Sequence, residues 1–227
     1  MCAQFGMFKD GKFLARIFKA KPPERGIRRG MVLPRRLGPV VTFEGGGRAL
    51  SEKQFGLIPS WSKESKVKFS THNARLVSID EKTGKQVPIY TKPTWREPFD
   101  RRHCLVPMEY FVEAIYYGEF AGNMVKFIPT GEEVIAAAGL WEDWVSKSSG
   151  EVVSTFAVIT DEPVPYIKSI GHDRSPVFLA PKDYDEWLGA GEKDPKRTVD
   201  FLQRSKADFS WKAEIERPMA PGWEKRK

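Results

Sequence analysis

Cys2 is the residue whose type and position offer the most distinctive chemistry, provided that Met1 is removed. A small second residue generally permits that removal, which leaves an α-amine and a thiol on adjacent carbons. Because an α-amine titrates near ~7.7–8.0 and a thiol near ~8.5, both are partly nucleophilic at neutral pH. The amine can form an imine with an aldehyde, and the thiolate can then close on the same carbon to give a thiazolidine. Position alone does not assign this role, because chain termini tolerate most residues.

Glu113 and His172 are the candidates for moving a proton. Glu113 stands in the apolar run 111–115, so its carboxylate is either exposed on the far face of a strand or desolvated with a raised pKa. Glutamate is rarely buried without a partner, which from the residues alone favours the exposed alternative. His172 precedes an apolar strand together with Arg174, close to a strand edge where sites often lie, although a lone histidine is usually structural or on the surface.

Basic and aromatic residues suggest a polyanionic partner. The net charge of the chain is +7, which indicates nucleic acid or simply a solvated basic surface. Trp61 is followed by Lys63, Lys66 and Lys68, a composition typical of a platform that stacks single-stranded bases. The alternative is that Trp61 covers the core. Asn73 and Arg75 are two residues apart, so in an extended segment they face the same way, and Arg75 could fork onto a phosphate.

The totals exclude several classes of protein. A chain of 227 residues with 41% hydrophobic residues can bury a sizeable core, as one large domain or two small ones. Its two cysteines make no disulfide framework, and no Cys/His cluster has the spacing of metal ligands. No apolar run resembles a signal peptide or a membrane span. We therefore expect a reduced, soluble protein without a bound metal.

Hydrophobic periodicity and turn signals predict a chain of strands with a few short helices. Residues 20–50 are rich in Lys, Arg, Pro and Gly and are predicted to be an irregular basic loop, after a turn at Asp10-Gly11. Strands are expected over 3–9, in the β-rich stretch 101–117, and over 124–129, 133–144, 152–160 and 211–216. Helices are expected over 163–171, 181–188 and 196–205.

Seven motifs occur in an order that resembles the SOS-response-associated peptidase (SRAP) family. They are Met1-Cys2, residues 56–61, Asn73-Ala74-Arg75, residues 102–107 with Glu113 six residues after Pro107, residues 139–142, residues 156–160, and His172-Asp173-Arg174. The resemblance implies an α+β fold, with a single compact domain around a strongly bent, barrel-like and mostly antiparallel β-sheet. We expect this domain to cover 1–227, with a polar tail over about 217–227.

The resemblance also implies an activity, the covalent capture of abasic sites in single-stranded DNA. By resemblance Cys2 is the nucleophile, Asn73 orients it, Glu113 is the general acid/base, and His172 assists imine chemistry and opening of the sugar ring. The implied DNA-binding residues are Trp61, Arg75, Thr160 and Arg174. No cofactor is implied. The expected protein is a monomer without a membrane partner, cytoplasmic in bacteria or encoded by a phage, or nuclear if eukaryotic.

Several departures mark a divergent member of that family. Gln4 stands where Arg is usual, and Met31 where Asn is usual. Phe55 and Ala114 stand where Trp is usual, and Ser175 where Met or Arg is common. Two other functions therefore remain open. One is a cysteine peptidase that uses Cys2, Glu113 and His172 on its own N-terminus. The other is a non-covalent reader of single-stranded or modified DNA.

Overall fold

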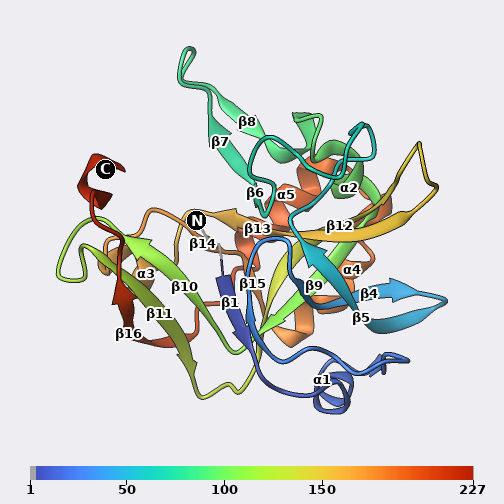
Figure 1. Ribbon diagram of the computed structural model, residues 1–227, viewed down its shortest axis with the longest axis horizontal. Helices are drawn as coiled ribbons and strands as arrows, with labels where there is room; N and C mark the ends of the chain where they lie inside the picture. Colours follow the sequence, from blue (N-terminus) through green and yellow to red (C-terminus); the bar gives the residue numbers. More distant parts are fainter. Residues whose placement is uncertain (1–3, 227) are drawn as a thin grey trace.

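Two β-sheets organise the computed structural model, which describes residues 4–226, without the side chains of Glu192 and Arg226. The first sheet has five strands, all antiparallel to their neighbours. Their order is β16 (Ser210–Pro218), β11 (Asn123–Thr130), β10 (Tyr110–Ile115), β1 (Gln4–Met7) and β3 (Gly30–Val32). Figure 1 shows this sheet on the left of the molecule, with β10 beside β1.

The second sheet has nine strands and bends until it closes on itself. Its main path is β14 (Ser175–Pro176), β13 (Val152–Asp161), β12 (Ile135–Val145), β9 (His103–Met108), β4 (Leu37–Glu44), β5 (Gly47–Phe55) and β2 (Ala20–Lys21). A further pairing of β13 with β5 joins five of these strands into a ring. β15 (Phe178–Leu179) pairs with β12, and β6 (Asn73–Arg75) pairs with β13. The predicted barrel-like, mostly antiparallel α+β fold is confirmed.

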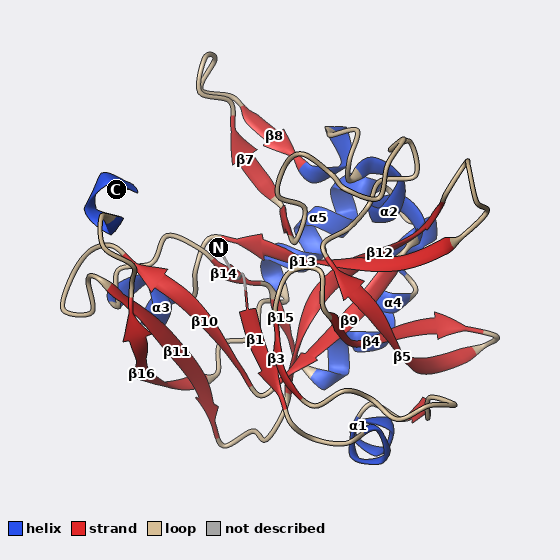
Figure 2. Ribbon diagram, in the orientation of Figure 1, coloured by secondary structure: helices blue, strands red, loops and turns tan. Residues whose placement is uncertain are grey.

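Short helices lie around the two sheets. They are α1 (Gly11–Ile17), α2 (Arg96–Arg101), α3 (Pro165–Ser169), α4 (Tyr184–Leu188) and α5 (Pro195–Arg204), with 3-10 turns at Ile89–Thr91, Pro181–Asp183, Ala190–Glu192 and Trp223–Arg226. Figure 2 shows α2, α4 and α5 gathered together beside the second sheet, whereas the ribbon of β7 (Val77–Ile79) and β8 (Gln86–Pro88) projects away. No helix in the described part of the chain is long and apolar enough to cross a membrane.

The buried apolar residues form two clusters, one on each side of the second sheet. One cluster lies between the sheets and joins Phe5 and Phe111 of the first to Phe55 and Phe156 of the second. The rings of Phe55 and Phe156 stack with centroids 5.0 Å apart. The other cluster packs the helices against the sheet, with Trp187 of α4 fully buried. Apolar burial on both faces explains why β9 is buried at every position.

The prediction of an irregular loop over residues 20–50 is wrong at β2 and β3 and throughout its second half. β4 and β5 form a long hairpin, whose turn is made by Gly45 and Gly46 at φ +60° and +81°, the left-handed pair that a tight hairpin turn requires. The outer residues of this hairpin are polar, which hid the strand pattern. The predicted turn at Asp10-Gly11 is instead a helix start, because the Asp10 side chain accepts the Phe13 N–H at 2.8 Å and caps α1.

Candidate functional site

A carboxylate and an imidazole meet in the interior, between the first sheet and the segment that leads into β14. Oε2 of Glu113 on β10 lies 3.5 Å from Nε2 of His172, and their side chains are only 1% and 6% exposed. The structure therefore decides that Glu113 is buried and paired, which is not the alternative that the residue pattern favoured. At 3.5 Å the contact is an ion pair or a long hydrogen bond that can shorten when a ligand binds.

The surroundings of His172 allow either neutral tautomer. Its Nδ1 lies 2.7 Å from the carbonyl oxygen of Arg174 and 3.1 Å from the Arg174 amide nitrogen. A protonated Nδ1 can donate to that carbonyl, whereas an unprotonated Nδ1 can accept from that amide. The proton on Nε2, which faces Glu113, can therefore be present or absent without leaving Nδ1 unpaired. This is a suitable arrangement for passing a proton.

Backbone geometry holds His172 in place. The residue before it, Gly171, has φ +97°, and a Cβ there would lie 2.5 Å from the carbonyl oxygen of Tyr117. Only glycine fits this close approach to the loop after β10. The His172 amide donates to the carbonyl of Ile167 in α3 at 3.3 Å. α3 and the loop after β10 thus fix the imidazole against Glu113.

Three of the predicted site residues lie in neighbouring strands beside this pair. Thr160 on β13 is opposite Arg75 on β6 and Pro176 on β14, and Asn73 is opposite Val158. The hydroxyl of Thr160 is buried and has no hydrogen-bond partner among the described residues. Arg174 directly precedes β14, and its Nε lies 3.7 Å from the Asp173 carboxylate. The fold thus gathers Asn73, Arg75, Thr160 and Arg174 at one end of β13, as a common site requires.

The structure adds Lys92, a residue that sequence reasoning missed. Burial lowers the pKa of Lys92, and the nearby charge of Arg75 lowers it further. Two cations that repel each other create a place where an anion is favoured. The next residue, Pro93, accepts the indole N–H of Trp61 at 3.3 Å. Lys92 had no signal in the sequence because it is separated from both Arg75 and Trp61 along the chain.

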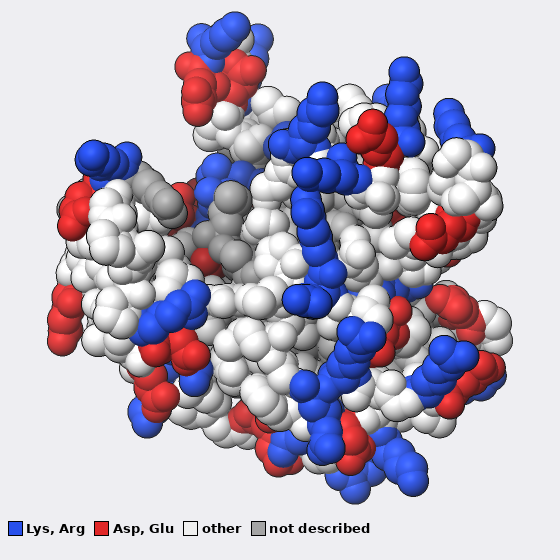
Figure 3. All heavy atoms as spheres, in the orientation of Figure 1, with Lys and Arg blue, Asp and Glu red and all other residues white. Residues whose placement is uncertain are grey.

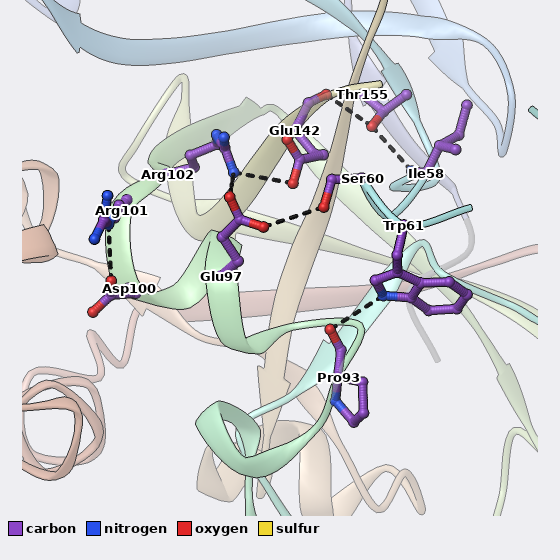
Figure 4. A network of polar contacts seen from close by, with 10 residues as sticks. All are labelled: Ile58, Ser60, Trp61, Pro93, Glu97, Asp100, Arg101, Arg102, Glu142 and Thr155. Carbon is purple, nitrogen blue, oxygen red and sulfur yellow. Dashed lines mark hydrogen bonds and ion pairs between the residues drawn. The ribbon is translucent and has the colours of Figure 1, made fainter. Parts of the chain in front are cut away.

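Trp61 does not cover the core, since its side chain is 53% exposed. Its segment is nevertheless anchored by the polar network of Figure 4. Ser60 Oγ donates to Glu97 Oε2 at 3.1 Å, and Arg102 Nη1 bridges Glu97 at 3.2 Å and the buried Glu142 at 3.0 Å. The indole is thus presented to solvent from a fixed base. Stacking of a nucleic-acid base is a use for such a side chain.

Two of the sequence motifs have a structural role in this network rather than a catalytic one. Arg102 opens the motif 102–107, and Glu142 closes the motif 139–142. Burial raises the pKa of Glu142 to about 7, against the opposing effect of Arg102. In the same motif a Cβ on Gly139 would lie 2.7 Å from Cγ2 of Val106. These residues hold strands together and support the Trp61 segment.

The predicted nucleophile, Cys2, lies outside the described residues. The description begins with Gln4, which is buried and pairs with Val112, the neighbour of Glu113. The other cysteine, Cys104, is fully buried, and burial raises the pKa of its thiol. It is therefore an inert core residue. No group of residues in the range 4–226 has the arrangement of a metal site.

Comparison with known proteins places this chain in a family. The family model described as SOS response associated peptidase (SRAP) matches residues 1–216. The chain belongs to the SRAP family. The abasic site processing protein YoaM of Bacillus subtilis is 32% identical over 164 residues, which are 72% of this chain and 65% of YoaM. The abasic site processing protein HMCES of Xenopus tropicalis is 28% identical over 178 residues, 68% of this chain and 49% of HMCES. The chain therefore spans less than two thirds of the length of these SRAP relatives.

Solved structures support the fold. A protein from Bordetella bronchiseptica superposes with a TM-score of 0.72 at 21% identity, covering 94% of this chain and 99% of the other. A protein from Bacteroides thetaiotaomicron gives a TM-score of 0.71 at 19% identity and covers 95% of this chain and 92% of the other. The SRAP domain described above is thus an architecture that distantly related sequences share.

Proposed function

We propose that this protein captures abasic sites in single-stranded DNA through a thiazolidine formed by Cys2 after removal of Met1. The observation that carries the proposal is the buried pair of Glu113 and His172, 3.5 Å apart, beside the strand that contains Gln4. Cys2 stands two residues before Gln4 in the sequence. The names of the curated relatives, which are abasic site processing proteins, support the same substrate.

The pair supplies the proton transfers that the chemistry needs. An abasic sugar opens when its anomeric hydroxyl loses a proton and the ring oxygen gains one, which Glu113 and His172 can accomplish together. The α-amine of Cys2 then attacks C1′ of the aldehyde, and an acid expels water to leave the imine. Addition of the thiolate to the imine carbon, with a proton taken up by nitrogen, closes the thiazolidine. The sum is aldehyde plus aminothiol giving thiazolidine plus water, without any oxidant or reductant.

The remaining residues have binding roles in this proposal. Asn73 orients Cys2, and Arg75 with Lys92 holds a phosphate next to the lesion. Thr160 and Arg174, one on each of two neighbouring segments, contact the same strand of DNA. Trp61 stacks on a base beside the lesion, where the missing base leaves a gap.

The test is incubation with an abasic single-stranded oligonucleotide followed by denaturing electrophoresis. We expect a shifted band that survives heat and denaturant, together with an intact mass that lacks Met1. Cys2→Ser keeps the α-amine, so it should lose this stable adduct but still form an imine that borohydride traps. An N-terminal extension that retains Met1 blocks the amine and should abolish both products.

Two outcomes would overturn the proposal. One is the absence of any denaturant-resistant band with the wild-type chain. The other is a heat-stable adduct from the extended protein, since it would require another nucleophile. A peptidase that acts only on its own Met1 would show the mass change without a DNA adduct. A non-covalent reader would show binding in native gels and no band under denaturing conditions.

A further inference from the structure

A groove outside the Glu113–His172 site runs along the segment 65–72, which connects the Trp61 segment to β6. It consists of two adjoining pockets of about 330 and 450 Å³, both lined by Arg35, Gln54, Ile58 and Ser65. One end is bounded by His72, the residue before Asn73, and the other reaches Trp144 near the end of β12. The groove therefore starts next to the candidate site and leads away from it.

The lining of this groove is basic and carries an exposed aromatic ring. Lys66, Lys68 and Arg35 supply positive charge, and the Phe69 side chain is 51% exposed. The acidic lining residue is Glu151, at the end near β12. Figure 3 shows Lys and Arg side chains in a column across the middle of the face that it draws. Cations beside an exposed aromatic ring bind single-stranded nucleic acid, because phosphates pair with the cations while a base stacks on the ring.

Backbone hydrogen bonds hold both walls of the groove. Arg35 has φ +67°, a left-handed conformation that non-glycine residues seldom adopt, and its amide donates to the Phe55 carbonyl at 2.6 Å. On the opposite wall, Leu57 donates to the carbonyl of Thr71 at 3.2 Å, and Val158 donates to that of His72 at 2.9 Å. A groove built in this way exists before a ligand arrives, which reduces the entropy lost on binding.

We propose that this groove binds intact nucleotides on one side of the abasic site, with a base on Phe69 and phosphates on Arg35, Lys66 and Lys68. The inference rests on the proposed function and extends it, since it makes the flanking strand part of the recognised substrate. An abasic residue has no base to stack, so binding energy must come from its neighbours. Trp61 stacks on the base beside the lesion, whereas Phe69 stacks on the base of a nucleotide further along.

The first test compares oligonucleotides with the abasic residue at the 5′ end, at the 3′ end and at the centre. Wild-type crosslinking should be faster with one terminal lesion than with the other, because only one of them has a flank that reaches the groove. Phe69→Ala combined with Lys66→Gln and Lys68→Gln should remove this difference. Equal rates for both terminal lesions in the wild type would overturn the proposal.

The second test does not depend on crosslinking. Fluorescence anisotropy with an unmodified single-stranded oligonucleotide should show that Phe69→Ala weakens binding about 5- to 150-fold, the equivalent of ~1–3 kcal/mol of base stacking. Each Lys→Gln change should lower the slope of log affinity against log salt by about 0.7. If the wild type forms no crosslink, the proposed function fails, and this measurement still decides whether the groove binds DNA.

The matched controls lie elsewhere on the surface. Phe43, near the turn of the β4–β5 hairpin, is 52% exposed, and Lys85 is exposed in the β7–β8 ribbon. Phe43→Ala and Lys85→Gln should leave strand affinity and its salt slope unchanged. A loss with these variants equal to that of the groove variants would show that binding is not localised, and would reject the groove as a site.

Discussion

Glu113 is a charged residue on a strand whose other buried members are apolar, and its position makes sense only together with His172. The two come from different parts of the chain, β10 and the segment before β14, and meet at 3.5 Å in the interior, where their side chains are almost fully buried. A carboxylate in such a place needs a polar partner. The imidazole is that partner, and it can also exchange a proton with the carboxylate.

Glu113→Gln and His172→Ala should each slow formation of the heat-stable adduct by about 10²–10⁴-fold, the usual contribution of one positioned acid or base. Cys2 keeps both nucleophiles in these variants, so slow crosslinking should remain measurable over longer times. The measurement is the adduct formed against time on denaturing gels, with far-ultraviolet circular dichroism to check the fold. Glu119→Gln, an exposed position in the loop after β10, is the charge-matched control and should react at the wild-type rate. Unfolding of Glu113→Gln would instead assign Glu113 to a purely structural pair.

At the scale of the elements, the network of Arg102, Glu142, Glu97 and Ser60 connects α2, β12 and the Trp61 segment. Its buried member is Glu142, whose carboxylate is 1% exposed, while Arg102 is 28% exposed and Glu97 53% exposed. Ion pairs at the surface contribute little, but a buried charge without its partner is strongly destabilising. The stability of this region should therefore depend on which partner is removed and on pH.

Arg102→Gln should reduce stability more at pH 8 than at pH 6. Burial raises the pKa of Glu142 to about 7, so the carboxylate is largely protonated at pH 6 and ionised at pH 8. A folded-state pKa above the unfolded value gives stability that is present at low pH and lost as pH rises through about 7. Without Arg102 this loss should be larger, on the order of 3 kcal/mol at pH 8, whereas Glu142→Gln should flatten the pH dependence. Urea unfolding at the two pH values measures both effects.

The exposed pair of Arg101 and Asp100 provides the control for the Arg102→Gln experiment. Arg101 Nε contacts Asp100 at 3.0 Å, but the two side chains are 75% and 45% exposed. Figure 4 shows this pair beside the buried network. Arg101→Gln should change the unfolding free energy by less than about 1 kcal/mol at either pH. The buried role of Glu142 would be contradicted if Arg102→Gln lowered the unfolding free energy equally at both pH values and by no more than Arg101→Gln does.

At the scale of the whole molecule, positive charge is in excess. The net charge is +7, and Figure 3 shows a column of Lys and Arg side chains across the middle of the face that it draws. The exposed rings of Trp61 and Phe69 belong to the same segment of chain between β5 and β6. Rings can stack only on bases that are splayed from a duplex.

We therefore expect tighter binding to single-stranded than to duplex DNA of the same sequence, with an affinity that falls steeply as salt increases. Fluorescence anisotropy across a salt series measures both properties. Trp61→Ala should reduce single-strand affinity and leave the salt slope unchanged, because the indole carries no charge. Equal affinity for intact duplex, or binding that is insensitive to salt, would reject the basic face as a single-strand platform.

The sequence by itself determined most of the strands and which residue types could act in a site. Apolar runs bounded by turn signals predicted β11, β12 and β13, and alternation predicted β16; these strands lie at 123–130, 135–145, 152–161 and 210–218. Local patterns succeed here because each strand buries one face or both. The motifs around Asn73, Glu113 and His172 also predicted the family, because their order along the chain is a property of the sequence alone.

Only the tertiary structure decided which of those residues meet. The burial of Glu113 depends on α3 and Gly171 bringing His172 to it from 59 positions away in the sequence. The proximity of Lys92 to Arg75 depends on the pairing of β6 with β13 and on the course of the loop after β8. The role of Arg102 and Glu142 appears only when α2 and β12 lie side by side. Contacts of this kind arise from long-range packing, and no local periodicity carries information about them.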